Sequence, residues 1–169
     1  MIPYLLTPPA SLPVTLDAMK AHLRVVHDND DADIAAKQAG AVALLDGWGG
    51  ILGRCIMPQV WAVDVIGPGP HILPFPDATG VAAVSGVDPV AVEVTRTGRG
   101  PCVVAESARA DQALTITATY ALPEPRLATA QTLVKLMVQR EFDIMAGADY
   151  EAITQSIQAH IAALRWVRI

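Results

Sequence analysis

Hydrophobic and polar positions change their spacing twice along this 169-residue chain. From about residue 15 to 54, apolar residues recur every three or four positions, as they do on one face of an α-helix. Between about residues 58 and 121, apolar and polar residues alternate, which is typical of half-buried β-strands. From about residue 126 to 164 the helical spacing returns. The pattern therefore predicts helices at both ends of the chain and a β region between them.

Two helices are predicted in the N-terminal part. The first follows Thr15, whose hydroxyl suits an N-cap, and continues to about Arg24. The second begins near Asp30, where carboxylates favour the positive end of the helix dipole, and continues toward Trp48. Many of its residues are alanine or glycine. A neighbouring helix could therefore approach it closely.

The clearest predicted strand covers residues 114–120, where apolar side chains and threonines separate completely between the two faces. The segment from Gln59 to Ile66 alternates in a similar way, and glycines and prolines after it predict a turn. Further strands are predicted at Gly80–Val87, Val90–Thr95 and Cys102–Glu106. These strands are expected to form an antiparallel β element.

Two more helices are predicted after the β region, from Arg126 to Met145 and from Tyr150 to Leu164, followed by a short tail at 165–169. The length of the chain suits one domain with its own core. The predicted fold is therefore a single α+β domain. Its helices, within about 15–54 and 126–164, form a small bundle, and an antiparallel β insertion at about 58–121 separates them.

The chain carries little charge. Hydrophobic residues make up 52% of the sequence and charged residues 17%, the net charge is −5, and the mean hydropathy is +0.36. An average soluble domain has about 25% charged residues, so part of this exterior is expected to be buried against partners. No apolar run reaches the ~18 residues that span a bilayer, so we expect no membrane segment. The absence of a Lys/Arg cluster disfavours tight DNA binding.

No residue pattern supports catalysis, a cofactor or a metal. The acidic segment 28–33 lacks the glycine and the glutamate of a calcium loop, so it is interpreted mainly as a helix start. The glycines at 47–53 lack the preceding strand and the Gly-Lys-Ser/Thr end of a phosphate loop. The histidines show no ligand spacing, and Cys55 and Cys102 have no Cys-x-x-Cys partner, which favours two buried thiols. We therefore predict a protein that is not an enzyme.

A succession of short motifs runs through the chain. They are the Leu-x-x-x-Lys-x-His-Leu-Arg pattern of Leu16–Arg24, the acidic segment Asp28–Asp33, Gly53-Arg54 followed by Gln59-Val60-Trp61, Leu73-Pro74-Phe75-Pro76, and Leu122-Pro123-Glu124-Pro125. In this order they resemble the bacteriophage head-tail connector (adaptor) family. The chain departs from the family pattern at Leu52, where threonine is usual, and in the glycine-rich segment 47–50.

This resemblance implies a structural part rather than an enzyme. It implies a ring, expected to hold 12 copies, in the neck of a virion or of a phage-like gene transfer particle assembled in the bacterial cytoplasm. The implied partners are the portal protein on one side and a head-closure (stopper) or tail terminator protein on the other. DNA would pass through the ring without specific binding. The alternatives are another neck or tail ring component, expected to be mostly β, and a small α+β enzyme.

Two groups of residues are candidates for contacts in such a ring. Carboxylates near the start of the second helix are candidates for facing the channel, since an acidic lumen would repel the DNA backbone. The C-terminal tail combines apolar and arginine side chains, and it either folds back on the bundle or is held by a partner, for which the resemblance suggests the portal. The channel-facing candidates are Asp28, Asp30, Asp31 and Asp33, and the portal-binding candidates are Leu164, Arg165, Trp166, Val167, Arg168 and Ile169.

Overall fold

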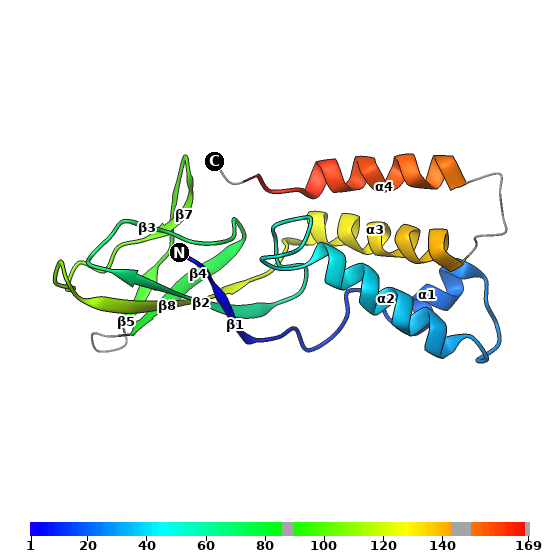
Figure 1. Cartoon of the computed structure of the whole chain (residues 1–169), viewed down its shortest axis with the longest axis horizontal. Helices are drawn as coiled ribbons and strands as arrows, with labels where there is room; N and C mark the ends of the chain where they lie inside the picture. Colours follow the sequence, from blue (N-terminus) through cyan, green and yellow to red (C-terminus); the bar gives the residue numbers. More distant parts are fainter. Residues whose placement is uncertain (86–89, 143–149, 168–169) are drawn as a thin grey trace. The chain divides into compact units, whose positions relative to one another are not determined.

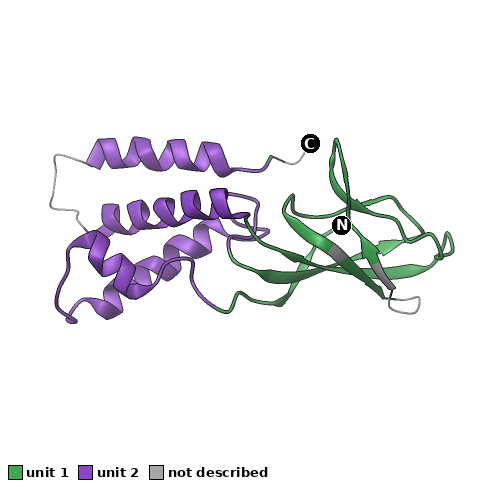
Figure 2. Ribbon diagram, turned by 180° about the vertical axis from the view of Figure 1, so that it is seen from behind, with its two compact units in different colours: residues 1–10, 57–122, 167–169 green, residues 11–56, 123–166 purple. Residues whose placement is uncertain are grey.

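The computed structural model describes residues 1–85, 90–142 and 150–167. It combines helices with antiparallel sheets, which confirms the predicted α+β class (Figure 1). The chain divides into two compact units, coloured separately in Figure 2. The helical unit comprises Ser11–Ile56 and Pro123–Trp166, and the β unit comprises Met1–Ala10, Met57–Leu122 and Val167–Ile169.

In the helical unit, α3 contacts each of the other three helices. Its buried residues recur at spacings of three and four, as the sequence pattern predicted. Apolar side chains of the neighbouring helices, among them Met19, Ile34 and Ile157, are also fully buried and complete this aliphatic core. The four helices of the described chain are α1 (Leu16–Leu23), α2 (Asp31–Leu45), α3 (Glu124–Phe142) and α4 (Tyr150–Leu164).

The predicted extension of the second helix toward Trp48 is wrong, because α2 ends at Leu45. Asp46 has extended backbone angles, and its carboxylate accepts a hydrogen bond from the Ile56 N–H at 2.6 Å. The chain then folds back on itself, and a Cβ atom at Gly50 would overlap backbone oxygens of this turn. The glycine-rich approach therefore makes a tight loop instead of a last helical turn.

The β unit contains two antiparallel sheets. The larger sheet has the strand order β1-β2-β8-β4-β5, and the smaller one has the order β3-β7-β6. The strands are β1 (Tyr4–Thr7), β2 (Gln59–Ile66), β3 (His71–Ile72), β4 (Ala78–Ser85), β5 (Val90–Glu93), β6 (Thr95–Thr97), β7 (Gly100–Val103) and β8 (Ala113–Tyr120).

An aromatic cluster lies at the core of the β unit. The ring of Phe75 makes edge contacts with Trp61, at 5.1 Å between centroids, and with Tyr120, at 5.0 Å. Burial alternates along β8, so its apolar face points inward as predicted. The Leu73–Pro76 segment, which the sequence analysis named as a motif without assigning it a structure, is buried throughout.

Several strand boundaries differ from the sequence-based prediction. Strand β1 (sequence Tyr-Leu-Leu-Thr) was not predicted, because it is short, lacks polar alternation and has prolines on both sides. It pairs with β2 at the edge of the larger sheet. The predicted strand Val90–Thr95 divides between β5 and β6, which belong to different sheets. The predicted ends at Gly86–Val87 and at Asp143–Met145 lie outside the described residues.

Candidate functional site

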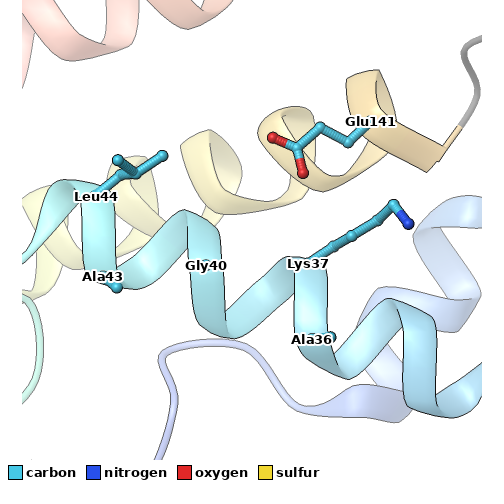
Figure 3. A pocket seen from close by; sticks show the side chains of 6 residues that line it. All are labelled: Ala36, Lys37, Gly40, Ala43, Leu44 and Glu141. Carbon is cyan, nitrogen blue, oxygen red and sulfur yellow. The ribbon is translucent and has the colours of Figure 1, made fainter.

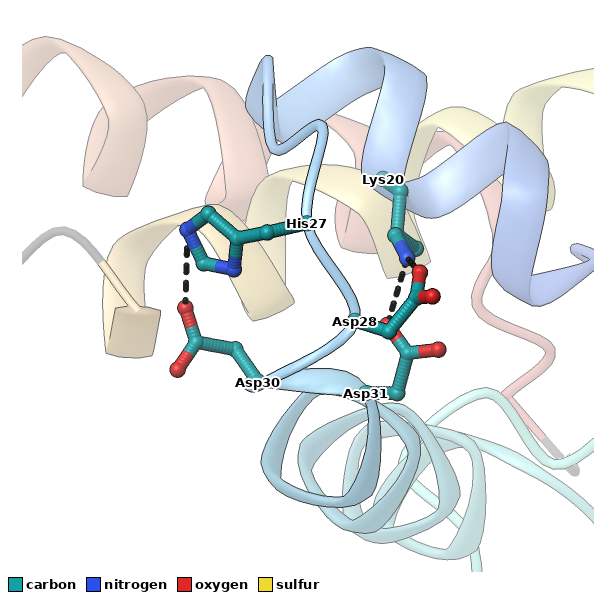
Figure 4. A network of polar contacts seen from close by, with 5 residues as sticks. All are labelled: Lys20, His27, Asp28, Asp30 and Asp31. Carbon is teal, nitrogen blue, oxygen red and sulfur yellow. Dashed lines mark hydrogen bonds and ion pairs between the residues drawn. The ribbon is translucent and has the colours of Figure 1, made fainter.

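Lys20 holds two of the four predicted channel carboxylates. Its ammonium group lies 2.6 Å from an Asp28 oxygen and 2.7 Å from an Asp31 oxygen (Figure 4). Lys20 comes from α1, and the two aspartates come from the loop before α2 and from its first turn. The side chain of Lys20 is only 12% exposed, whereas that of Asp28 is 88% exposed. The cluster therefore ties α1 to the start of α2 and leaves one carboxylate facing solvent.

These ion pairs shift the protonation equilibria of both partners. The hydrogen bond from Lys20 lowers the pKa of Asp28 below its ordinary value. The hydrogen bonds to Asp28 and then Asp31 raise the pKa of Lys20 above its ordinary value. Both shifts favour the charged forms, so the pair stays ionised at neutral pH.

The other two candidate carboxylates lie near a histidine and a lysine. His27 lies 3.8 Å from Asp30, and Lys37 pairs with Asp33 one helical turn away. Asp30 is at the N-cap position of α2, but its side chain makes no capping hydrogen bond. The four carboxylates outnumber the two lysines that pair with them, so this cluster carries a modest negative charge.

An open groove with a volume of about 570 Å³, called the α2 groove, lies beside α2 on the side of Glu141 (Figure 3). One side is formed by α2, and Glu141 of α3 contributes to the other. Leu44 is 55% exposed there, and a Cβ at Gly40 would have no atom within 4 Å apart from the neighbouring backbone of its own helix. The groove is therefore an open surface in which small residues leave room for a partner. The lining residues are Ala36, Lys37, Gly40, Ala43, Leu44 and Glu141.

The first part of the C-terminal tail is attached to the helical unit. Leu164 is 1% exposed, and the Trp166 N–H donates a hydrogen bond of 2.8 Å to the Leu52 carbonyl. The Arg54 guanidinium lies over the Trp166 ring, 5.8 Å from its centroid, which is cation–π geometry. Gly53 has a φ of +61°, and a Cβ there would come within 3.1 Å of the Trp166 carbonyl oxygen. These residues therefore fold back on the helical unit.

Two other residues of the tail are exposed. Arg165 is exposed, and the side chain of Val167 is 64% exposed. Arg168 and Ile169 lie outside the described residues. The predicted portal-binding group is thus divided between anchoring and exposed side chains.

The sequence analysis did not predict that the loop at 46–56 contacts the C-terminal tail. Arg54 is 5% exposed, and it was noted only as part of a motif. A signal was present in two separate places: Arg54 follows a glycine-rich segment that permits close backbone approach, and Trp166 near the C-terminus can accept a cation–π contact. Nothing in the local spacing, however, links residues more than 100 positions apart.

Across the described residues, no group of three or more His, Cys, Asp or Glu side chains is arranged to hold a metal ion. No helix among them is long and apolar enough to cross a membrane. Cys55 and Cys102 are both buried as free thiols, as the sequence indicated.

The fold has a counterpart among solved structures. The chain aligns over its full length with 97% of a chain from a structure described as the neck of an empty GTA (gene transfer agent) particle computed with C6 symmetry. The TM-score is 0.67 and the sequence identity is 19%, so the likeness establishes a shared fold. No protein-family model matches the chain, and no curated protein matches it in sequence.

Proposed function

We propose that this chain is a structural component of the neck of a phage-like particle, and specifically a head-tail connector (adaptor). The observation that carries the proposal is the likeness, over nearly the whole length of both chains, to a protein chain in the neck of a GTA particle. The ordered succession of connector-like motifs, from Leu16–Arg24 to Leu122–Pro125, supports the same assignment independently. The role is mechanical and requires no catalysis.

In this proposal, copies of the chain form a ring between the portal and a stopper or tail terminator, and DNA passes through it. Twelve copies suit the C6 symmetry used for the related neck, because twelve is a multiple of six. The α2 groove is assigned to lateral packing, since Gly40 and Ala43 leave room for a neighbouring helix and Leu44 is an exposed apolar contact. Burying such surface stabilises association at about 25 cal/mol per Å² before its entropic cost.

The tail is assigned to portal binding. Leu164 and Trp166 anchor it, and the exposed Arg165 and Val167, together with Arg168 and Ile169, make the contact. Arginine and apolar side chains are common in the energetically important part of interfaces.

The carboxylates at Asp28, Asp30, Asp31 and Asp33 are assigned to the channel wall. Lys20 and Lys37 partly neutralise these carboxylates, so the wall repels the DNA backbone only weakly and does not bind it. Replacing all four with Asn would leave Lys20 and Lys37 as the local charges and reverse the sign. Particles with this variant are expected to eject DNA more slowly, and unchanged ejection kinetics would contradict a lumenal position. Incorporation of the variant into necks controls for its folding.

A stopper or tail terminator is the rival function, but a chain of that kind was expected to be mostly β. The four described helices, two on each side of the central β region, favour the connector. The deciding experiment combines light scattering and negative-stain imaging of the purified protein, alone and with the portal of the same particle. We expect rings at the narrow end of the portal. A protein that stays monomeric in both conditions would refute the connector assignment, and binding only to isolated tails would support the rival.

A further inference from the structure

Positive charge in the β unit is confined to a few arginines. The unit has no lysine, and its arginines within the described residues are Arg96, Arg99 and Arg109. All three are exposed, and none forms an ion pair with a described residue. Arg96 and Arg99 lie together on the hairpin formed by β6 and β7. They form the one place in the described β unit where two cations share a turn.

The hairpin turn that carries them is ordered by its own hydrogen bonds. Arg96 pairs with Pro101 and Thr97 with Gly100 in the strand register. The Thr97 hydroxyl donates a hydrogen bond of 2.8 Å to the Gly100 carbonyl and accepts one of 3.3 Å from the Arg99 N–H. On the β7 side the strand is buried, so the turn is held by the unit's core. The two guanidinium groups are therefore presented from a fixed base.

The exposed side chains of this turn indicate which kind of partner it can bind. Guanidinium groups offer planar pairs of N–H donors that match phosphate oxygens. The exposed residues from Thr95 to Arg99 include no large apolar side chain, so the turn lacks the apolar centre of a protein–protein interface. A contact with a phosphate backbone needs only charged donors. This difference favours a nucleic acid over an acidic protein.

We propose that the β6–β7 turn, through Arg96 and Arg99, contacts the phosphate backbone of duplex DNA. The inference rests on the proposed function, which brings a duplex within reach of the chain. Two cations in a chain of net charge −5 give a weak contact that does not depend on base sequence. A ring presents many copies of this turn to one duplex. Together the contacts retain the DNA, while each one is weak enough for the DNA to slide.

The first test is residue-resolved NMR of the purified protein with a short duplex of mixed sequence at low salt. We expect amide shift changes centred on Gly98–Gly100 that disappear as salt is added. Because each phosphate contact contributes about −0.9 to the slope of log K against log salt, removing both arginines should flatten that slope by roughly 2. Absence of shifts at the turn, or shifts confined to other elements, would overturn the proposal.

Two double variants separate this turn from general charge effects. Arg96→Gln/Arg99→Gln should abolish the shift changes. The control Arg24→Gln/Arg109→Gln removes the same charge from two exposed arginines elsewhere and should retain them. A polyglutamate peptide at equal charge concentration tests the acidic-protein alternative. Equal shifts with that peptide would overturn the assignment to DNA.

The second test uses assembled particles. The Arg96→Gln/Arg99→Gln variant should enter necks as the wild type does, while heads that lack tails lose their packaged DNA faster. Failure of this variant to enter necks would show that the turn contacts protein, which overturns the inference. Failure of the wild-type chain to appear in necks would instead refute the proposed function, and the NMR result would still decide whether the turn binds a duplex.

Discussion

The two units close their cores in different ways. The β unit takes almost all of its core from one stretch, residues 57–122, and packs Phe75 against two other aromatic rings. The helical unit joins two stretches that are separated by that insertion, and its core is aliphatic. The comparison indicates that the β core depends on a few large side chains, whereas the helical core depends on keeping distant segments together.

Three hydrogen bonds to backbone carbonyls join distant segments of the helical unit. The buried Gln38 amide donates to the Val14 carbonyl, the Gln131 amide donates to the Pro13 carbonyl at 2.9 Å, and the Trp166 N–H donates to Leu52. In each case the donor or acceptor lies in an irregular segment. Such bonds satisfy backbone groups outside regular structure and also fix where those segments lie.

The largest effect is expected from the aromatic core. Phe75→Ala should lower the free energy of unfolding by about 3–5 kcal/mol, because it removes a ring that is 1% exposed and leaves a cavity between Trp61 and Tyr120. Denaturant unfolding gives the magnitude. In NMR spectra the loss should concentrate in the β unit while the helices persist. Uniform loss of both units would show that they unfold as one.

A smaller effect is expected from the tail. Trp166→Ala should cost about 1–3 kcal/mol, since the ring is half-buried and lies against the Arg54 guanidinium. Thermal unfolding followed by helical circular dichroism measures it. The matched variant Arg165→Glu/Val167→Asp changes exposed neighbours and should keep the wild-type stability while weakening portal binding. If both variants bind portal normally, the tail serves only the subunit's own core.

Substitutions in the α2 groove test whether the helical unit also packs against neighbouring subunits in a ring. Gly40→Ala should stabilise the subunit by about 0.5–1 kcal/mol, because the helix gains propensity and the added Cβ meets nothing within 4 Å. Gly40→Trp should leave the subunit folded but prevent rings on the portal, as judged by negative-stain imaging. The control Ala35→Trp places the same ring on an exposed α2 position outside the groove. Rings formed normally by Gly40→Trp would exclude lateral packing there.

The smallest effect is expected from the ion pairs at the start of α2. The lowered pKa of Asp28 predicts a contribution to stability that is present above its ordinary value near 3.8 and is lost as the pH falls through the folded pKa. The raised pKa of Lys20 predicts a contribution that is present below about 10.5 and is lost as the pH rises through the folded pKa. Asp28→Asn should therefore reduce the acid dependence of thermal unfolding slightly. Added salt should reduce it further, because Asp28 is exposed.

Sequence alone determined those features whose cause is local. The alternation on β8, the three-and-four spacing on α3 and the Thr15 cap, which accepts the Ala18 N–H, each depend on side chains within a few positions of one another. The acidic segment and the apolar tail were also recognised from neighbouring residues alone. These features determined the α+β class and the succession of two helices, a β region and two further helices from Leu16 onward.

Tertiary structure decided what lies beside what. The end of α2 at Leu45 depends on Asp46 accepting a hydrogen bond from Ile56 and on a glycine loop that receives Trp166. The division of Val90–Thr95 between two sheets, and the strand β1, depend on partners far along the chain. Hydrogen bonds and burial that form only when remote segments meet leave no periodic trace in the sequence, because neither segment needs a special pattern of its own to make them.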